Sequence, residues 1–310
     1  MQIFFAVSGF LYGKKTIKNF KSWMLQRAQR IWVPVVIVVL ISAIVLTTVY
    51  HVSIDAVSLI AYLLNLQGLL FINWGFFSKF IHEISILGPL WFATLIMICY
   101  CLVPILQRIR DRLANCSASS KQRKYMLYIV LAYVCAVLLE VTTGTSLTYF
   151  VVFAIGYFMA DAQIDKTQFS LRKALVYFFT VPALGIMRIV LRRFIDGTTL
   201  YTALISIGHP IMGISLLCLV IELGKRFPDV YSKIAGSKVM VFLDGASLYI
   251  YLLHYIFLNS PTSVFEHFNL GIATILFLLL TIICSIILWR LTDLIVGQMR
   301  KLSKSTGSAK

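Results

Sequence analysis

The chain of 310 residues is far more apolar than a soluble domain, with 60% hydrophobic and 13% charged residues and a mean hydropathy of +0.89. Soluble domains have about 45–50% apolar and about 25% charged residues, because only part of a folded domain is interior. The composition therefore excludes a soluble globular enzyme, a disordered chain and a collagen-like fibre. It predicts an all-α fold, a polytopic membrane helical bundle.

The formal net charge of +16 arises from 28 lysines and arginines against 12 acidic residues. Such an excess is found in nucleic-acid-binding proteins, and also in the cytosolic loops of membrane proteins. In so apolar a chain we interpret it as the positive-inside pattern and expect no nucleic-acid partner.

The six cysteines indicate neither a disulfide framework nor a metal site. All but Cys116 lie within apolar runs, where cysteine acts as a small apolar side chain. Cys99 and Cys101 are two residues apart, so on a helix they point to opposite sides and cannot share a metal.

The apolar runs predict about nine transmembrane segments, because a bilayer core about 30 Å thick needs roughly 20 helical residues. A first run, Gln2 to Gly13, is too short to span alone and lacks the basic N-terminal flank of a signal peptide. The longer runs lie at 31–50, 86–106, 125–143, 146–162, 172–191, 200–222, 239–260 and 271–296. We expect one membrane-embedded domain over residues 1–296 and a polar, disordered cytosolic tail over 297–310.

The basic residues predict the orientation of these segments. If the loops at 14–30, 107–124, 163–173, 225–238 and 290–310 face the cytosol, all but four of the 28 lysines and arginines lie on that side. The four exceptions are Lys79, Arg188, Arg192 and Arg193. This places the protein in the cell (cytoplasmic) membrane with a cytosolic C-terminus.

The apolar stretch 54–72 is long enough to span, but a crossing there would move every later loop to the opposite side. The charge asymmetry would then be lost, so we expect this stretch to be interfacial or packed in the outer mouth. The same parity places Met1 outside, so we expect a further spanning helix before it in the complete protein.

Four sequence motifs occur in order along the chain. They are FFAVSGFLYGKK at 4–15, RAQRIWVPV at 27–35, GPLWFATLIM at 88–97 and LDGASLYIYLLHY at 243–255. Together they resemble the integral-membrane acyltransferase 3 family, which includes bacterial polysaccharide O-acetyltransferases and fucose 4-O-acetylase-like proteins. The resemblance covers essentially the whole chain. The family's first helix, with its basic residue and catalytic histidine, has no matching position here, which leaves open whether this chain alone is active.

The resemblance implies transfer of an acyl group, most often acetyl, from acyl-CoA to a hydroxyl of a cell-surface or exopolysaccharide sugar. Acetyl-CoA or another acyl-CoA would be the co-substrate, and no permanently bound cofactor is implied. The expected partners are therefore acyl-CoA, a glycan or lipid-linked sugar acceptor, and membrane lipids.

Arg27 and Arg30 are three residues apart and share one face of a helix. Guanidinium groups bind phosphates well, so we interpret this pair as a binding site for the phosphates of acyl-CoA. The alternative is that both are ordinary positive-inside anchors.

The run at 239–260 carries a polar stripe. At 100° per residue, the polar residues of this run lie on one side of the helix. Polar side chains inside a membrane are energetically costly unless they face protein or water. We expect His254 to act as base, orienting group or donor, with Tyr251 and Ser247 as hydrogen-bond partners. A packing network with a neutral histidine is the alternative. The stripe comprises Asp244, Ser247, Tyr251, His254 and Tyr255.

Other residues are candidates for binding the acceptor. Asn73 and Trp74 lie in the outer loop with His82 and Glu83, and Trp91 lies near the outer interface. Tryptophan at that level is also a common membrane anchor.

Arg188, with Arg192 and Arg193, can bind an anionic glycan or lipid phosphate, or can snorkel to headgroups. These intramembrane groups also suit a transporter or flippase for a lipid-linked glycan or small anion. That is the main alternative function. For Ser8 and Gly9 we expect close helix packing.

Overall fold

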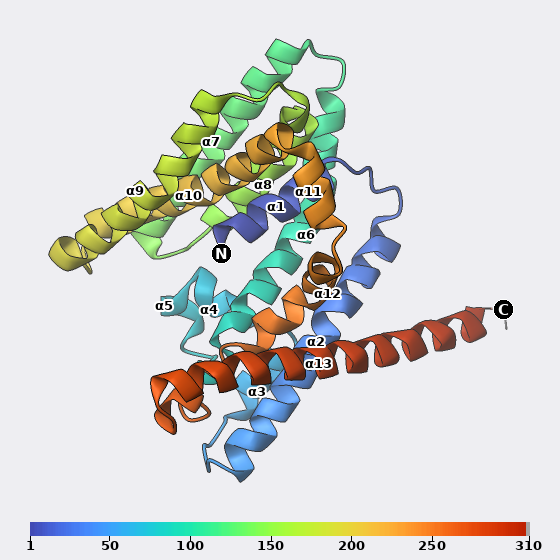
Figure 1. The fold of residues 1–310 in the computed structure, drawn as a ribbon, viewed down its shortest axis with the longest axis vertical. Coiled ribbons are helices and arrows are strands. Elements are labelled where there is room, and N and C mark those ends of the chain that lie inside the picture. Colours follow the sequence, from blue (N-terminus) through green and yellow to red (C-terminus); the bar gives the residue numbers. More distant parts are fainter. Residues whose placement is uncertain (308–310) are drawn as a thin grey trace. The chain divides into compact units, whose positions relative to one another are not determined.

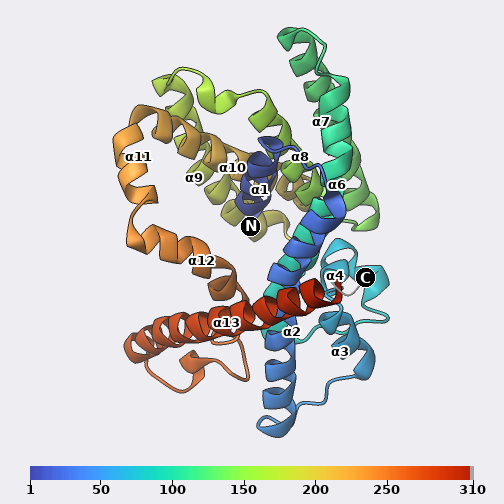
Figure 2. The same ribbon diagram turned by 90° about the vertical axis from the view of Figure 1, so that its right-hand side faces the viewer.

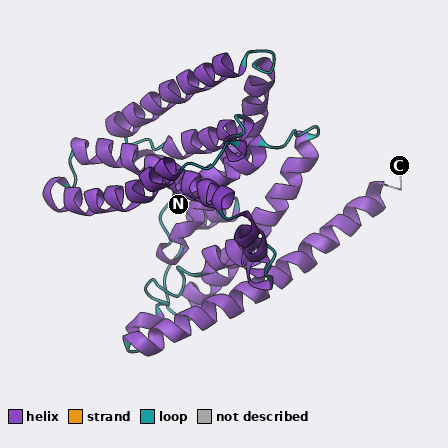
Figure 3. Cartoon of the chain, turned by 45° about the horizontal axis from the view of Figure 1, so that its top comes forward, coloured by secondary structure: helices purple, strands orange, loops and turns teal. Residues whose placement is uncertain are grey.

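The computed structural model describes the backbone of residues 1–307 and the side chains up to residue 299, together with that of Lys301. Within residues 1–307 the regular structure is helical and no strand occurs (Figure 3). The predicted all-α fold is thus confirmed.

The helices follow one another through short connections (Figure 1). Their bounds are α1 Gln2–Gly13, α2 Phe20–Thr48, α3 Ala56–Leu63, α4 Gly68–Ile72, α5 Trp74–Phe77, η1 Ser85–Leu90, α6 Trp91–Arg112, α7 Ala118–Thr143, α8 Thr148–Asp161, η2 Ile164–Lys166, α9 Leu171–Ile195, α10 Thr199–Arg226, α11 Pro228–Ala235, α12 Lys238–Leu253, η3 Val264–Glu266 and α13 Leu270–Gly307.

Among the described residues, 6 helices are long and apolar enough to cross a membrane. They are α2, α6 extended by η1, α7, α9, α10 and α13. The pair α11 and α12 qualifies only as one broken span, and α1 and α8 are shorter apolar helices. Each of these elements coincides with one of the predicted apolar runs, so the chain is a multi-pass membrane protein.

The chain forms two compact units. The first comprises residues 1–20 and 98–234, and the second comprises residues 21–97 and 235–310.

In the first unit, α1 packs against α8 and α10 (Figure 2). A Cβ on Gly9 would lie 2.0 Å from the carbonyl oxygen of Phe153, and one on Gly156 would lie 2.1 Å from that of Ala6. Gly9 and Gly13 have the GxxxG spacing that lets two membrane helices approach closely. The predicted packing role of Gly9 is confirmed.

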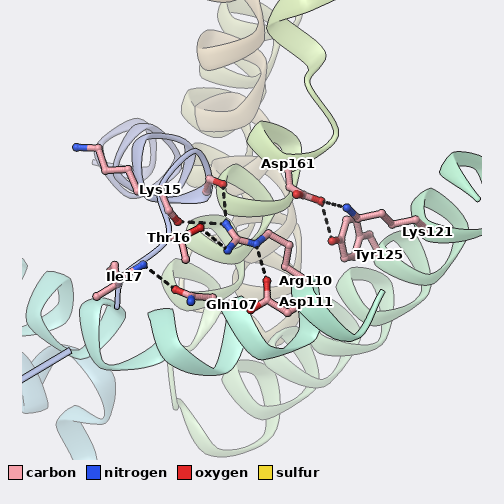
Figure 4. Close-up of polar contacts among 10 residues, drawn as sticks. Lys15, Thr16, Ile17, Gln107, Arg110, Asp111, Lys121, Tyr125 and Asp161 are labelled. Carbon is pink, nitrogen blue, oxygen red and sulfur yellow. Dashed lines mark hydrogen bonds and ion pairs between the residues drawn. The ribbon is translucent and has the colours of Figure 1, made fainter. Parts of the chain in front are cut away.

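Polar contacts fix the connection that follows α1 (Figure 4). The Arg110 guanidinium donates to the carbonyl oxygens of Gly13 at 3.3 Å and Lys15 at 3.1 Å, and to Thr16 Oγ1 at 3.1 Å. Arg110 therefore satisfies carbonyl groups that the end of α1 leaves without helical partners.

A second cluster in the same view ties α7 to α8. Asp161 accepts a hydrogen bond from Tyr125 at 2.8 Å and forms an ion pair with Lys121 at 2.6 Å. The carboxylate of Asp161 thus links α8 to α7 through one ion pair and one hydrogen bond.

In the second unit, α12 packs against α13, and Gly245 faces the indole of Trp289. The segment after α2 doubles back along that helix. The evidence is a hydrogen bond from Trp32 Nε1 to the Leu63 carbonyl oxygen at 2.5 Å. Trp32 precedes Thr48, the last residue of α2, by a helical length of about 24 Å. The stretch 54–72 forms two short helices, α3 and α4. Neither is a candidate membrane span, which agrees with the expectation that this stretch does not cross the membrane.

The structure corrects three predicted boundaries. The helix α2 begins at Phe20, so Arg27 lies within it and the expected loop does not extend to residue 30. The helix α12 ends at Leu253, not near 260, although apolar residues continue past its end.

The third correction concerns the tail. The helix α13 continues to Gly307, so residues 297–307 are not the disordered segment that was expected; residues 308–310 lie outside the described part. Extending an existing helix is easier than nucleating one, which accounts for the error.

Candidate functional site

The end of α12 positions two of the three predicted catalytic residues. The Tyr251 hydroxyl donates to the Pro89 carbonyl oxygen at 2.8 Å, which ties α12 to η1. His254 caps the helix, and its Nδ1 lies 2.7 Å from the Tyr251 carbonyl oxygen. Both side chains are half-buried.

The contact to Tyr251 determines which imidazole nitrogen can act as a base. A carbonyl oxygen only accepts, so Nδ1 carries the proton in this contact and Nε2 has the free lone pair. The rings of Tyr251 and Tyr255 flank the imidazole, with centroids at 5.5 Å and 6.1 Å. His254 is therefore an oriented histidine with a basic nitrogen opposite its anchor.

Ser247 is placed differently from its prediction. It lies on an exposed part of α12, and its hydroxyl donates to the Asp244 carbonyl oxygen of its own helix at 3.1 Å. The structure thus bonds His254 to the backbone carbonyl oxygen of Tyr251, while the hydroxyls of Tyr251 and Ser247 bond to other carbonyl oxygens.

The residue after His254 contacts a cavity of the same unit through Gly88 of η1. Gly88 is the contact point, because a Cβ there would lie 3.3 Å from both Glu83 Oε1 and Tyr255 Cε1. The cavity has a volume of about 230 Å³. Its lining residues are Tyr62, Gln67, Leu70, Phe71, Trp74, Glu83, Gly88 and Trp91.

Two predicted acceptor-binding residues, Trp74 and Trp91, line this cavity. Trp91 stacks on Phe71 with centroids 3.9 Å apart and an interplanar angle of 6°. Asn73 has a structural task, since its side chain caps α5 by accepting from the Phe76 N–H at 3.1 Å.

Arg188 belongs to the first unit and lines a different cavity of about 330 Å³ with Arg192 and His209.

A buried hydrogen-bond network supports the first cavity. Gln67 Nε2 donates to Asn65 Oδ1 at 3.0 Å and to the Leu90 carbonyl oxygen at 2.9 Å. Thr94 Oγ1 accepts from the Gly68 N–H at 3.0 Å and donates to the Asn65 carbonyl oxygen at 2.9 Å. These bonds fix the turn between α3 and α4 against the start of α6. Sequence reasoning missed Gln67, although an amide inside an apolar stretch is itself a signal.

The two candidate donor-binding arginines lie on α2 in the second unit. Arg30 is exposed and has no ion pair with a described residue, while Arg27 is half-buried.

These features define a multi-pass, all-α membrane protein that has an oriented histidine and, in the same unit, a polar and aromatic cavity. The family model described as an acyltransferase domain, that of the acyltransferase 3 family, matches residues 1–290. The chain therefore belongs to the acyltransferase 3 family and is a membrane acyltransferase. Among curated proteins and solved structures, none matches the sequence significantly.

Proposed function

We propose that this protein transfers an acyl group, acetyl in the simplest case, from acyl-CoA to a sugar hydroxyl of a cell-surface or exopolysaccharide glycan. The observation that carries the proposal is the anchoring of His254, whose Nδ1 contacts the Tyr251 carbonyl oxygen at 2.7 Å. This contact leaves Nε2 available to a substrate.

The proposed chemistry uses His254 Nε2 first as base and then as acid. A sugar hydroxyl is a poor nucleophile near neutral pH, so Nε2 removes its proton as the oxygen attacks the thioester carbonyl. The tetrahedral intermediate then expels the CoA sulfur, which takes the proton back from the imidazolium. The products are the sugar ester and free CoA, and the histidine returns to its starting state.

The donor is proposed to enter from the cytosol, where the positive-inside pattern places Arg27 and Arg30. The exposed Arg30 guanidinium is suited to the phosphates of acyl-CoA. On this arrangement the protein lies in the cell membrane, the C-terminus faces the cytosol, and no cofactor stays bound.

The test uses membrane vesicles of cells that produce the protein, supplied with acetyl-CoA labelled in the acetyl group. Acetyl-CoA does not cross membranes, so everted vesicles should incorporate label into glycan as an alkali-labile ester, and right-side-out vesicles should not. Passage of an unmodified glycan or anion without ester formation would contradict the proposal and favour a transporter or flippase.

A further inference from the structure

The cavity beside Gly88 has one aromatic wall. The rings of Phe71 and Trp91 hold each other in a stack, and Trp74 completes the wall with 52% of its surface exposed. Broad aromatic faces of this kind bury the flat C–H faces of ring-shaped ligands that also carry polar groups.

The lining of the cavity also includes a buried amide. Gln67 is 2% exposed, and its two N–H groups are bonded to Asn65 and Leu90. These bonds fix the orientation of the amide, and its Oε1 is buried without a partner among the described residues. A buried acceptor without a donor is unfavourable, and a ligand hydroxyl that donates to this oxygen would satisfy it.

The charge of the lining restricts the ligand. Glu83 is the single charged side chain in the described lining. Tyr62 adds no charge at neutral pH, because burial raises the pKa of its hydroxyl to about 12. A neutral ring rich in hydroxyl groups suits this mixture of acceptors, whereas an anionic ring is repelled by Glu83.

We propose that this cavity, lined by Tyr62, Gln67, Phe71, Trp74, Glu83 and Trp91, binds one neutral sugar ring and discriminates against anionic sugars. The inference rests on the proposed function, because it assigns the ring to the acceptor glycan. The volume of about 230 Å³ is below the usual range of drug-sized sites, which suits a single ring rather than an oligosaccharide. The contact of Tyr255 with Gly88 places the subsite beside the residue that follows His254.

The test measures binding of simple glycosides to the purified protein in detergent by saturation-transfer NMR. The neutral probes are the methyl glycosides of glucose, galactose and rhamnose, and the anionic probe is methyl glucuronide. At least one neutral probe should bind, and the glucuronide should not.

Trp74→Ala removes part of the aromatic wall at an exposed position, so folding should persist. It should raise the Kd of the neutral probe about 2- to 13-fold, which corresponds to an aromatic contact of about 0.5–1.5 kcal/mol. Phe76→Ala is the matched control, because Phe76 is 55% exposed on the same helix and lies outside the lining. Glu83→Gln, which keeps the shape of the side chain, should admit the glucuronide.

The outcomes separate this inference from the proposed function. If labelled acetyl reaches the glycan but no neutral probe binds, or Phe76→Ala weakens binding as much as Trp74→Ala, the subsite assignment is wrong and the function stands. If a neutral probe binds as expected but no ester forms, the cavity binds sugar and the proposed acyl transfer is wrong.

Discussion

The contact of α1 with α8 makes a quantitative prediction for the substitution Gly156→Ala. The added Cβ would lie 2.1 Å from the carbonyl oxygen of Ala6 and 3.1 Å from the nitrogen of Phe10. Both are backbone atoms that cannot rotate away, so the two helices must separate. Overpacking of this kind typically costs about 1–3 kcal/mol.

Alanine also favours a helix over glycine by about 1 kcal/mol, so a matched control is needed. Gly185→Ala provides it, since Gly185 lies in α9 of the same unit and a Cβ there would meet nothing within 4 Å. Both variants gain the helix propensity, and only Gly156→Ala suffers the clash. We therefore expect Gly156→Ala to have a free energy of unfolding about 1–3 kcal/mol below that of Gly185→Ala.

The assay is unfolding of the purified protein in mixed micelles of dodecyl maltoside and increasing SDS, followed by circular dichroism. The midpoints and slopes of the two variants are compared with those of the unmodified protein. Equal stabilities for Gly156→Ala and Gly185→Ala would refute the close approach of α1 to α8.

Three further predictions concern the donor site, a helix cap and the orientation. Arg30→Ala should raise the KM for acetyl-CoA about 10- to 150-fold, the equivalent of a charged contact of about 1.5–3 kcal/mol. The control Lys21→Ala, at an exposed position of the same helix, should leave this KM unchanged. Equal KM values for the two variants in steady-state kinetics would show that Arg30 is only a membrane anchor. Asp55→Ala should lower the free energy of unfolding by about 0.5–2 kcal/mol, because Asp55 caps α3 through the Ser58 N–H at 2.7 Å. Hydrogen bonding to Ser58 lowers the pKa of the Asp55 carboxyl. The stability from this cap is therefore present above about pH 4 and is lost as the pH falls through the lowered pKa. An effect of Asp55→Ala on the free energy of unfolding that is the same at about pH 7 and about pH 2 would contradict this. In a cysteine-free background, Lys79→Cys should react with an impermeant maleimide in intact cells and Arg123→Cys should not, and the reverse pattern would invert the orientation.

The sequence predicted the helical fold well, because the membrane imposes long apolar runs that can be read directly. The stretch 54–72 is apolar enough to span, and the distribution of lysines and arginines among the loops correctly predicted that it does not. The structure divides this stretch into short helices. The predicted end of α12 near 260 was wrong because apolar residues continue past His254. The glycines of α1 indicate close packing from their spacing, but the sequence does not show that α8 is the partner helix.

The candidate site was less accessible from the sequence. The contact of His254 Nδ1 with the backbone carbonyl oxygen of Tyr251 is local, whereas helical spacing suggested the Tyr251 side chain, whose hydroxyl bonds to Pro89. The cavity, by contrast, is assembled from α3, α4, α5, η1 and α6, and only tertiary packing brings Gln67 and Trp91 to one place. Ser247 was expected to be a hydrogen-bond partner of His254. Its hydroxyl instead donates to a backbone carbonyl oxygen one turn back along its own helix.

The central claim, that His254 Nε2 is the base for acyl transfer, is tested most directly by the rate of ester formation in everted vesicles for His254→Gln. His267→Gln is the control, because it changes an exposed histidine of the same unit. With protein amounts matched, His254→Gln should lower the rate about 10²- to 10⁴-fold while His267→Gln leaves it unchanged. A rate for His254→Gln equal to that of the unmodified protein would show that His254 only packs α12, and the account of the site would be wrong.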